Sequence, residues 1–302
     1  MRDLPNIEIL DLNFLGQSDA IASFLIESDD GLILIETGPE STFKTLKRAI
    51  EDAEYDWKDV KHVLLTHIHF DHAGAAWKFA ENGAKIYVHP IGLPHLQNPE
   101  RLWNSAKMIY KEEMETLWGR MEPIDESLLV PAKDGDTIAI GKLEFKVHYT
   151  PGHAVHHNAY QIGTTIFTGD VAGVHINHGP VQPPCPPPDI NIGLWKLSIR
   201  KLKNLHPQVL YLTHYGIVAN PQEHLDKLEK ELNDWANWMK PHYDNGEKAE
   251  IIIPDFMAYT KQKLVNAGVA KSDIARYEKA NPSWMSVSGL LRYWKLKEQG
   301  RI

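Results

Sequence analysis

Four short stretches of the chain place histidine or aspartate directly after a run of strand-forming residues. They are Thr66–Gly74 (THIHFDHAG), Thr150–His153 (TPGH), Thr168–Asp170 (TGD) and Thr213–His214 (TH). A side chain at the end of a strand is held by rigid backbone, yet it emerges into the loop layer, where a cleft can form. The sequence therefore predicts a fold in which strand ends from distant parts of the chain gather around one polar site.

The first of these stretches is the most informative about the site. Alternate residues of an extended segment face the same way, so we expect His67, His69 and Asp71 to converge on one side. His72 would begin the following helix and point toward a second centre. Imidazole and carboxylate together suit zinc, iron or manganese better than calcium, which prefers a shell of oxygen atoms. Three imidazoles on one ion leave a coordination position for water, as a catalytic site requires.

The order Thr-His-x-His-x-Asp-His in this stretch resembles the signature of the metallo-β-lactamase-fold superfamily. The resemblance extends over roughly residues 5–220 with the later motifs in the expected order, and hydroxyacylglutathione hydrolases share the complete set of ligands. It implies an αββα sandwich, in which two mixed β-sheets pack together, helices flank both, and the metals lie at one edge. It also implies that Asp170 bridges two metals, one held by His67, His69 and His153 and the other by Asp71, His72 and His214.

The resemblance implies hydrolysis with two divalent metal ions, of which Zn²⁺ is favoured and iron or manganese are alternatives. A water that bridges two such ions loses its proton near neutral pH, its pKa falling from 15.7 toward about 7 in the best single-zinc cases. The bridging hydroxide would then attack an electrophilic carbonyl or phosphoryl group. We assign a catalytic role to Asp71, which would orient this nucleophile and help to pass its proton to the leaving group. Asp170 would supply the negative charge that lets two cations lie ~3.5–4 Å apart.

Patterns of apolar residues divide the chain into two parts. Strands, several of them in hairpins, are predicted at 21–27, 31–36, 60–66, 85–89, 137–140, 143–149, 159–162, 165–168 and 209–213. Helical spacing predicts helices at 41–53, 74–82, 99–121 and 193–205. Strand patterns nearly vanish after Pro221, and helices are predicted at 223–239, 256–266 and 286–297. We therefore predict a catalytic domain, residues 1–220, and a helical C-terminal extension, residues 221–302.

Charge and composition exclude several classes of partner. The chain carries 32 basic and 40 acidic residues, and its net charge of −8 repels nucleic acid. No run approaches 18 consecutive apolar residues, so neither a membrane-spanning helix nor a membrane partner is expected. The single cysteine, Cys185, cannot form an intrachain disulfide, which fits a reducing compartment and a cytoplasmic location. The expected partner is a small-molecule substrate, and the C-terminal helices could cover the cleft or build a homodimer with apolar surface from Trp235, Trp238 and Trp284.

Departures from particular branches of the superfamily narrow the substrate. Asp170 argues against true β-lactamases, which generally lack this carboxylate, and Gly173 stands where acyl-homoserine lactonases carry a tyrosine. The basic patch that hydroxyacylglutathione hydrolases use for glutathione is not evident in residues 225–240. We therefore expect hydrolysis of a small ester, thioester or lactone. The alternatives are a mononuclear iron enzyme resembling sulfur dioxygenases and a non-catalytic metal-binding protein, and metal content together with turnover would separate all three.

Several residues near the motifs have more than one interpretation. Glu36 stands where the superfamily usually has aspartate, which leaves its contact with the metal ligands open. His157 fits a supporting role behind the ligands, whereas His175 and His178 could line the cleft or fill a loop. Surface or hydrogen-bonded positions are expected for the remaining histidines that we interpret: His62, His89, His95, His148, His206, His224 and His242.

Two segments are also open to interpretation. The amphipathic segment 102–121 could form a lid or wall over the cleft, with Trp103, Tyr110 and Trp118, or pack on the core or on a second subunit. The prolines of Pro183–Pro188 must keep that stretch extended and outside any sheet, where it could be a stiff rim of the site or a connector.

Overall fold

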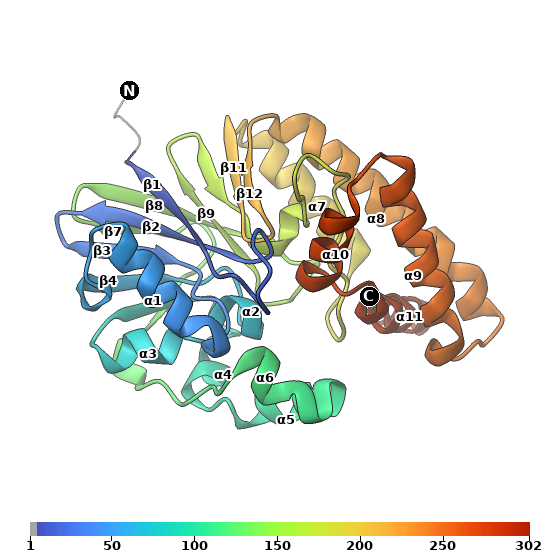
Figure 1. The fold of residues 1–302 in the computed structure, drawn as a ribbon, viewed down its shortest axis with the longest axis horizontal. Coiled ribbons are helices and arrows are strands. Elements are labelled where there is room, and N and C mark those ends of the chain that lie inside the picture. Colours follow the sequence, from blue (N-terminus) through green and yellow to red (C-terminus); the bar gives the residue numbers. More distant parts are fainter. Residues whose placement is uncertain (1–4) are drawn as a thin grey trace.

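Two six-stranded sheets pack face to face in the structure of the protein, a computed structural model that describes residues 5–302 (Figure 1). The first sheet keeps the order of the chain: β1 (Ile7–Asp11), β2 (Ala22–Ser28), β3 (Gly31–Ile35), β4 (Val60–Leu64), β5 (Lys85–Val88) and β6 (Leu129–Pro131). The second has the order β12 (Gly216–Val218), β11 (Val209–Leu212), β10 (Thr165–Phe167), β9 (Asn158–Ile162), β8 (Leu143–Tyr149) and β7 (Thr137–Ile140). Both sheets are mixed, because hairpin strands pair antiparallel while β3 to β6, and also β10 and β11, pair parallel.

Alternation along the strands explains why both faces of the first sheet are covered. In β3, Ile33 and Ile35 belong to the cluster between the two sheets, whereas Leu32 and Leu34 belong to the cluster beneath the helices. Successive residues of a strand point to opposite faces, so a strand that is apolar throughout must be buried on both. The cluster between the sheets also contains aromatic residues from both, among them Phe24, Phe145, Tyr160 and Phe167.

Helices cover the outer face of each sheet (Figure 1). Against the first sheet lie α1 (Phe43–Asp52), α2 (Phe70–Ala73), α3 (Ala76–Glu81), α4 (Leu93–Gln97), α5 (Glu100–Tyr110) and α6 (Met114–Trp118). Against the second lie α7 (Ile192–Asn204), α8 (Pro221–Asp244), α9 (Ala249–Asn266) and α11 (Ser283–Glu298). The predicted αββα sandwich with a helical C-terminal region is therefore confirmed.

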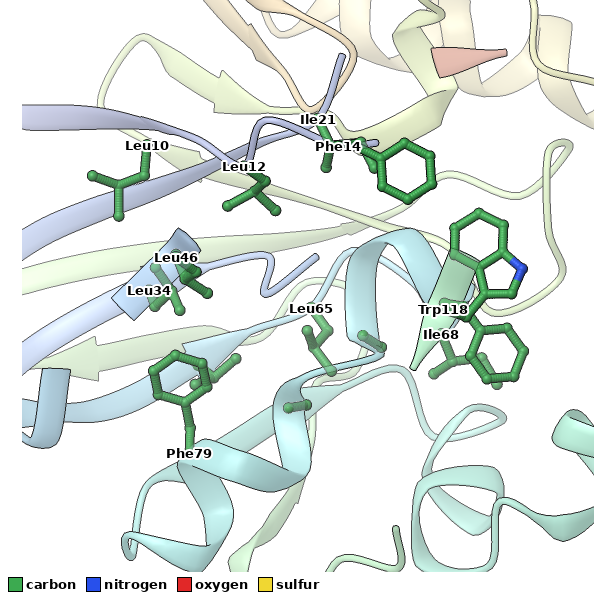
Figure 2. Close-up of a cluster of buried hydrophobic side chains, with 14 of the residues drawn as sticks. Leu10, Leu12, Phe14, Ile21, Leu34, Leu46, Leu65, Ile68, Phe79 and Trp118 are labelled. Atoms are coloured by element: carbon green, nitrogen blue, oxygen red, sulfur yellow. The ribbon is translucent and has the colours of Figure 1, made fainter. Parts of the chain in front are cut away.

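One C-terminal helix contributes to the other side of the molecule. Tyr277 and Ala280 of α10 (Lys271–Ala280) are buried in the cluster of the first sheet, together with residues from α5 and α6. Figure 2 shows Phe14, Ile68 and Trp118 at one end of this cluster, away from Phe79 at the other. The end that contains Trp118 lies beside the polar site described below.

The single helix predicted at 99–121 is wrong. α5 ends at Tyr110, a short 3₁₀ turn spans Lys111–Glu113, and α6 begins at Met114. Lys111 has φ +48, outside the helical region, so the chain changes direction at this residue. The apolar spacing continues past the break because both helices bury their apolar sides in the same cluster.

The C-terminal helices share a core with the second sheet. One cluster joins Ile166 and Leu210 from the strands with Leu228 of α8, Phe256 of α9 and Leu290 of α11. The division of the chain at residue 220 stays a prediction. Among the described residues, none of the helices is both long and apolar enough to cross a membrane.

Candidate metal centre

Three histidines and one aspartate converge where β4, β8 and β10 end, and we call them the first ligand group. His67 Nε2 and His153 Nε2 each lie 3.0 Å from His69 Nδ1, and His153 Nε2 lies 3.2 Å from Asp170 Oδ2. Ligand atoms around a tetrahedral zinc ion at 2.0–2.1 Å lie roughly 3.3 Å from one another. The spacing of these four atoms therefore fits a single transition-metal ion.

A second ligand group, Asp71, His72 and His214, lies next to the first. Asp71 Oδ2 is 3.6 Å from His72 Nε2 and 3.3 Å from His214 Nε2. These residues come from α2 and from the loop after β11. Two imidazoles and a carboxylate leave coordination positions open in a four- or five-coordinate site.

Asp170 connects the two groups through its two oxygens. Oδ2 faces His153 of the first group, whereas Oδ1 lies 3.3 Å from His72 Nε2 and 3.5 Å from His214 Nε2 of the second. His72 Nε2 and Asp170 Oδ1 are buried without a hydrogen-bond partner. Because buried polar atoms without partners are costly, these orphaned atoms fit two divalent ions that share one carboxylate.

The prediction that Asp71 faces the same way as His67 and His69 is wrong. His69 is still extended, with φ −62 and ψ 153, but α2 begins at the next residue, Phe70. Asp71 therefore lies on a helical turn beside His72, and the alternation of an extended chain no longer applies to it. The grouping implied by the family resemblance matches the observed one, although the assignment of these residues as metal ligands remains a proposal.

The second nitrogen of most of these histidines is held by a neighbouring oxygen. His153 Nδ1 donates to Pro184 O at 2.8 Å, and His214 Nδ1 donates to Ala20 O, also at 2.8 Å. His67 Nδ1 lies 3.0 Å from Thr66 Oγ1. Such contacts fix the ring orientation and the tautomer, so that the other nitrogen is presented to a metal.

The carboxylate of Glu36 faces the second nitrogen of His72 in an ion-pair contact rather than a hydrogen bond. Its Oε2 lies 3.3 Å from His72 Nδ1, and its Oε1 accepts a hydrogen bond from Thr66 N at 3.1 Å. The residue is fully buried and directly follows β3 with φ +63, a strained conformation for a residue other than glycine. Glu36 therefore contacts the proposed ligand His72, a contact that the sequence alone leaves open.

Burial and local charge shift the histidine pKa values of the two ligand groups in opposite directions. Burial lowers the pKa of His69 to about 3, and it also lowers the pKa of His67 and His153. Burial opposes protonation of His72 and His214 too, but Asp170 and Asp71 outweigh it and raise the pKa of both imidazoles. Metal binding requires neutral imidazole. The histidines of the second group must therefore release protons when they bind a metal, whereas those of the first group have none to release.

A histidine that sequence reasoning does not identify lies beside the first group. The ring of His156 is buried, lines the cavity above the centre, and stands edge-on to His69 with 5.7 Å between ring centroids. Its Nδ1 has no hydrogen-bond partner. Its position in the sequence, three residues after His153 and directly before His157, could have identified it as a residue of the site.

The remaining histidines near the motifs have separate positions. His157 is buried and stacks on His67 at 4.9 Å, and its Nδ1 lies 2.8 Å from Thr150 Oγ1, which agrees with a supporting role. His175 and His178 are not among the residues that line the cavity in the described part of the chain. Both therefore belong to the loop that follows Asp170.

A cavity of about 410 Å³ lies over the centre, with His69, Asp71 and Asp170 in its lining. One wall comes from α5 and α6, which agrees with the wall interpretation of segment 102–121 and also with its packing on the core. Pro184 and Pro186–Pro188 contribute a second wall, so the proline-rich stretch lines the site and stays outside the sheets. The α10–α11 junction forms a third, through Lys279–Pro282 and Met285.

The sequence model of the metallo-beta-lactamase superfamily matches residues 18–214, a range that contains both ligand groups. The chain belongs to the metallo-beta-lactamase superfamily. Among its relatives, metallo-beta-lactamase fold-containing protein ST1585 of Sulfurisphaera tokodaii is 27% identical over 183 residues, 58% of this chain and 69% of the relative. The probable metallo-hydrolase YqjP of Bacillus subtilis is 22% identical over 227 residues, 68% of this chain and 70% of the relative.

Solved structures of the superfamily share the fold. Metallo-beta-lactamase family protein TTHA1429 from Thermus thermophilus aligns with a TM-score of 0.72 at 19% identity, covering 98% of this chain and 95% of its own. The MIM-2 metallo-beta-lactamase aligns with a TM-score of 0.56 at 19% identity, covering 77% of this chain and 88% of its own. The share of this chain that TTHA1429 covers includes the C-terminal helices, whereas the likeness to MIM-2 leaves about a quarter of the chain unmatched.

Proposed function

We propose that this protein is a metal-dependent hydrolase that acts on a small ester, thioester or lactone and uses two divalent ions. The observation that carries the proposal is Asp170, whose two oxygens each face a different ligand group at the lining of a cavity. The cavity volume lies within the range of pockets that take small molecules. The membership of the superfamily and the name of the relative YqjP, a probable metallo-hydrolase, support the same reaction type.

Divalent ions held by these residues would supply an activated water and polarise the substrate carbonyl. The residues of the chain then have distinct roles. His67, His69 and His153, already neutral because of burial, present nitrogen ligands without first losing a proton. Asp71 is the most accessible member of the second group, with 21% of its side chain exposed, and both histidines contact its Oδ2. We therefore assign Asp71 the role of accepting a proton from water and returning it to the leaving group.

The experiment that tests the proposal combines metal analysis with a substrate panel. Protein loaded separately with zinc, manganese or iron should hold about two ions per chain, and it should hydrolyse at least one of a panel of esters, thioesters and lactones. Asp170→Asn should lose metal from both groups and more than about 100-fold in activity, because disturbing supporting contacts alone costs 10–100-fold. Asp189→Asn changes a carboxylate of the cavity wall outside both groups, and it should keep the full metal content.

Two results would contradict the proposal. One iron per chain with oxygen uptake and no hydrolysis would instead indicate a mononuclear dioxygenase. Two bound ions with no turnover of any substrate would indicate a metal-binding protein without catalysis.

A further inference from the structure

We propose that the cavity selects substrates by an apolar chain, so that the enzyme hydrolyses esters, thioesters or lactones of medium-chain acids. This inference rests on the proposed function and deepens it. Its basis is the arrangement of the cavity wall, which is apolar in its depth and along one path to the surface.

The buried part of the wall is apolar and largely aromatic. Trp118 stacks on Phe14 with 5.6 Å between ring centroids, and it lies 6.3 Å from Phe70 and 5.1 Å from Tyr110. Figure 2 shows the rings of Phe14 and Trp118 near Ile68, which directly precedes the ligand His69. An alkyl chain attached to a substrate carbonyl at the metal centre would pack against this surface and be removed from water.

The charged residues of the wall lie at the mouth. Arg101 and Lys279 are exposed and Asp189 is partly exposed, so each can keep its charge in water. They include both signs and so do not form a site for one charged group. Recognition of a strongly charged substrate would require such groups in the depth of the cavity, where the described residues outside the ligand groups offer neutral polar groups: the side chains of His156 and Asn281, the indole N–H of Trp118 and the hydroxyl of Tyr110.

Exposed apolar side chains continue the apolar surface out of the cavity. Ile91, Ile109 and Val155 line it and are 51%, 37% and 44% exposed. They come from three separate segments, namely the loop after β5, the helix α5 and the loop between β8 and β9. Scattered single apolar residues on a surface are ordinary, but three around one opening mark a binding surface. A chain longer than the buried part of the cavity would cover these side chains.

Chain length provides the test, because each methylene buried from water contributes a measurable factor. Zinc-loaded protein would be assayed with p-nitrophenyl esters from acetate to dodecanoate, and with δ-lactones that carry alkyl substituents of increasing length. We expect kcat/KM to rise about fourfold per methylene in at least one series, the equivalent of about 0.8 kcal/mol, until the cavity and its rim are filled.

A pair of neighbouring variants locates the effect. Ile109→Asp places a charge on the apolar rim and should lower the ratio of kcat/KM for the longest substrates to kcat/KM for the acetate ester about tenfold. Met108→Asp introduces the same charge at the adjacent position of α5, which is 76% exposed and does not line the cavity, and it should leave the whole series unchanged. Thermal unfolding would verify that both variants fold like the parent.

The outcomes separate the inference from the proposed function. Hydrolysis with no dependence on chain length in either series would overturn the inference and leave the hydrolase proposal intact. Equal effects of the two variants would also overturn it. If nothing is hydrolysed, the proposed function fails, and calorimetric binding of decanoate and butyrate decides the question of the cavity: tighter binding of decanoate supports the apolar-chain site, and equal binding refutes it.

Discussion

The metal centre and the cavity wall above it are held in place by different forces. At the centre, oxygens such as Pro184 O, Ala20 O and the Glu36 carboxylate fix the orientation of individual imidazoles. The wall is held by the packing of apolar side chains from α5, α6 and α10, and its hydrogen bonds, such as those from Tyr277 Oη to Pro180 O and from Ser41 Oγ to Leu117 O, orient no member of the ligand groups. The comparison indicates that directional contacts position the proposed ligands, whereas apolar packing shapes the cavity proposed to take the substrate. The first two predictions below each change one of these regions and measure the other.

The largest effect is expected in the wall. Trp118→Ala removes the ring that stacks on Phe14, and we expect it to lower the free energy of unfolding by about 3 kcal/mol. We expect the lower end of the usual range because the buried indole N–H has no partner to lose. Urea denaturation would measure the loss. Metal content should stay at the parental level, and a loss of metal in folded protein would show that wall and centre are not independent.

A change at the centre should alter the metal affinity and leave the substrate selectivity of the wall unchanged. Glu36→Gln removes the carboxylate charge that faces His72 Nδ1, and we expect a 10–100-fold lower metal affinity of the second group. Competition with a chelator would measure it, with Glu27→Gln on the exposed side of β2 as the control. Chain-length selectivity of the residual activity should be unchanged. An unaltered affinity would refute the role of Glu36.

Acid should weaken the side of the molecule that contains the centre. Burial lowers the pKa of His224 to about 4, and its Nε2 donates to Ala172 O, two residues after Asp170. The unfolded chain takes up a proton near the ordinary pKa of 6.5, so this stabilising contribution is complete above that pH and is lost as the pH falls toward 4. At pH 5 the loss amounts to about 2 kcal/mol. His224→Gln should therefore lose correspondingly less stability between pH 7 and pH 5 in urea denaturation than the parent.

The smallest effect is expected at the turn between α5 and α6. Lys111 has φ +48 and ψ −120, a conformation that glycine adopts more readily. Lys111→Gly should raise the free energy of unfolding by up to about 1 kcal/mol. Lys107→Gly, inside α5, should lower it by about the same amount. Thermal unfolding of the two variants should show opposite signs, and a loss of stability in both would mean that the turn is not strained.

Much of the architecture can be predicted from apolar patterns, since hairpins such as 137–149 depend on local alternation and turn residues. Of the strands without a prediction, β1 (Ile7–Asp11) has an apolar alternation at Ile7 and Ile9 that could have predicted it. β6, which ends in Pro131, and β12, which begins with Gly216, have three residues each. They form because neighbouring strands supply hydrogen bonds, which no local pattern encodes. The break between α5 and α6 at Lys111 is likewise not encoded by a local pattern.

Motifs in the sequence identify the residues of the candidate centre, but they do not predict all of their positions. The residues of both ligand groups stand in motifs that a sequence displays, and all seven come together in the structure. The position of Asp71 could not be predicted from alternation, because the start of α2 at Phe70 depends on its packing in the core. The contacts of Glu36 and His156 also depend on segments that meet only in the folded chain.

The bond from His214 Nδ1 to Ala20 O joins residues 194 positions apart, and Ala22 N also bonds to Thr213 O at 2.9 Å. During synthesis, the first ligand group is complete once Asp170 has emerged, whereas the second still lacks its last imidazole. At about 5–20 residues per second, that interval lasts several seconds. A nascent chain could therefore capture one ion before the other, and the hydrogen bonds that join Ala20 and Ala22 to the second sheet would form only when Thr213 and His214 arrive.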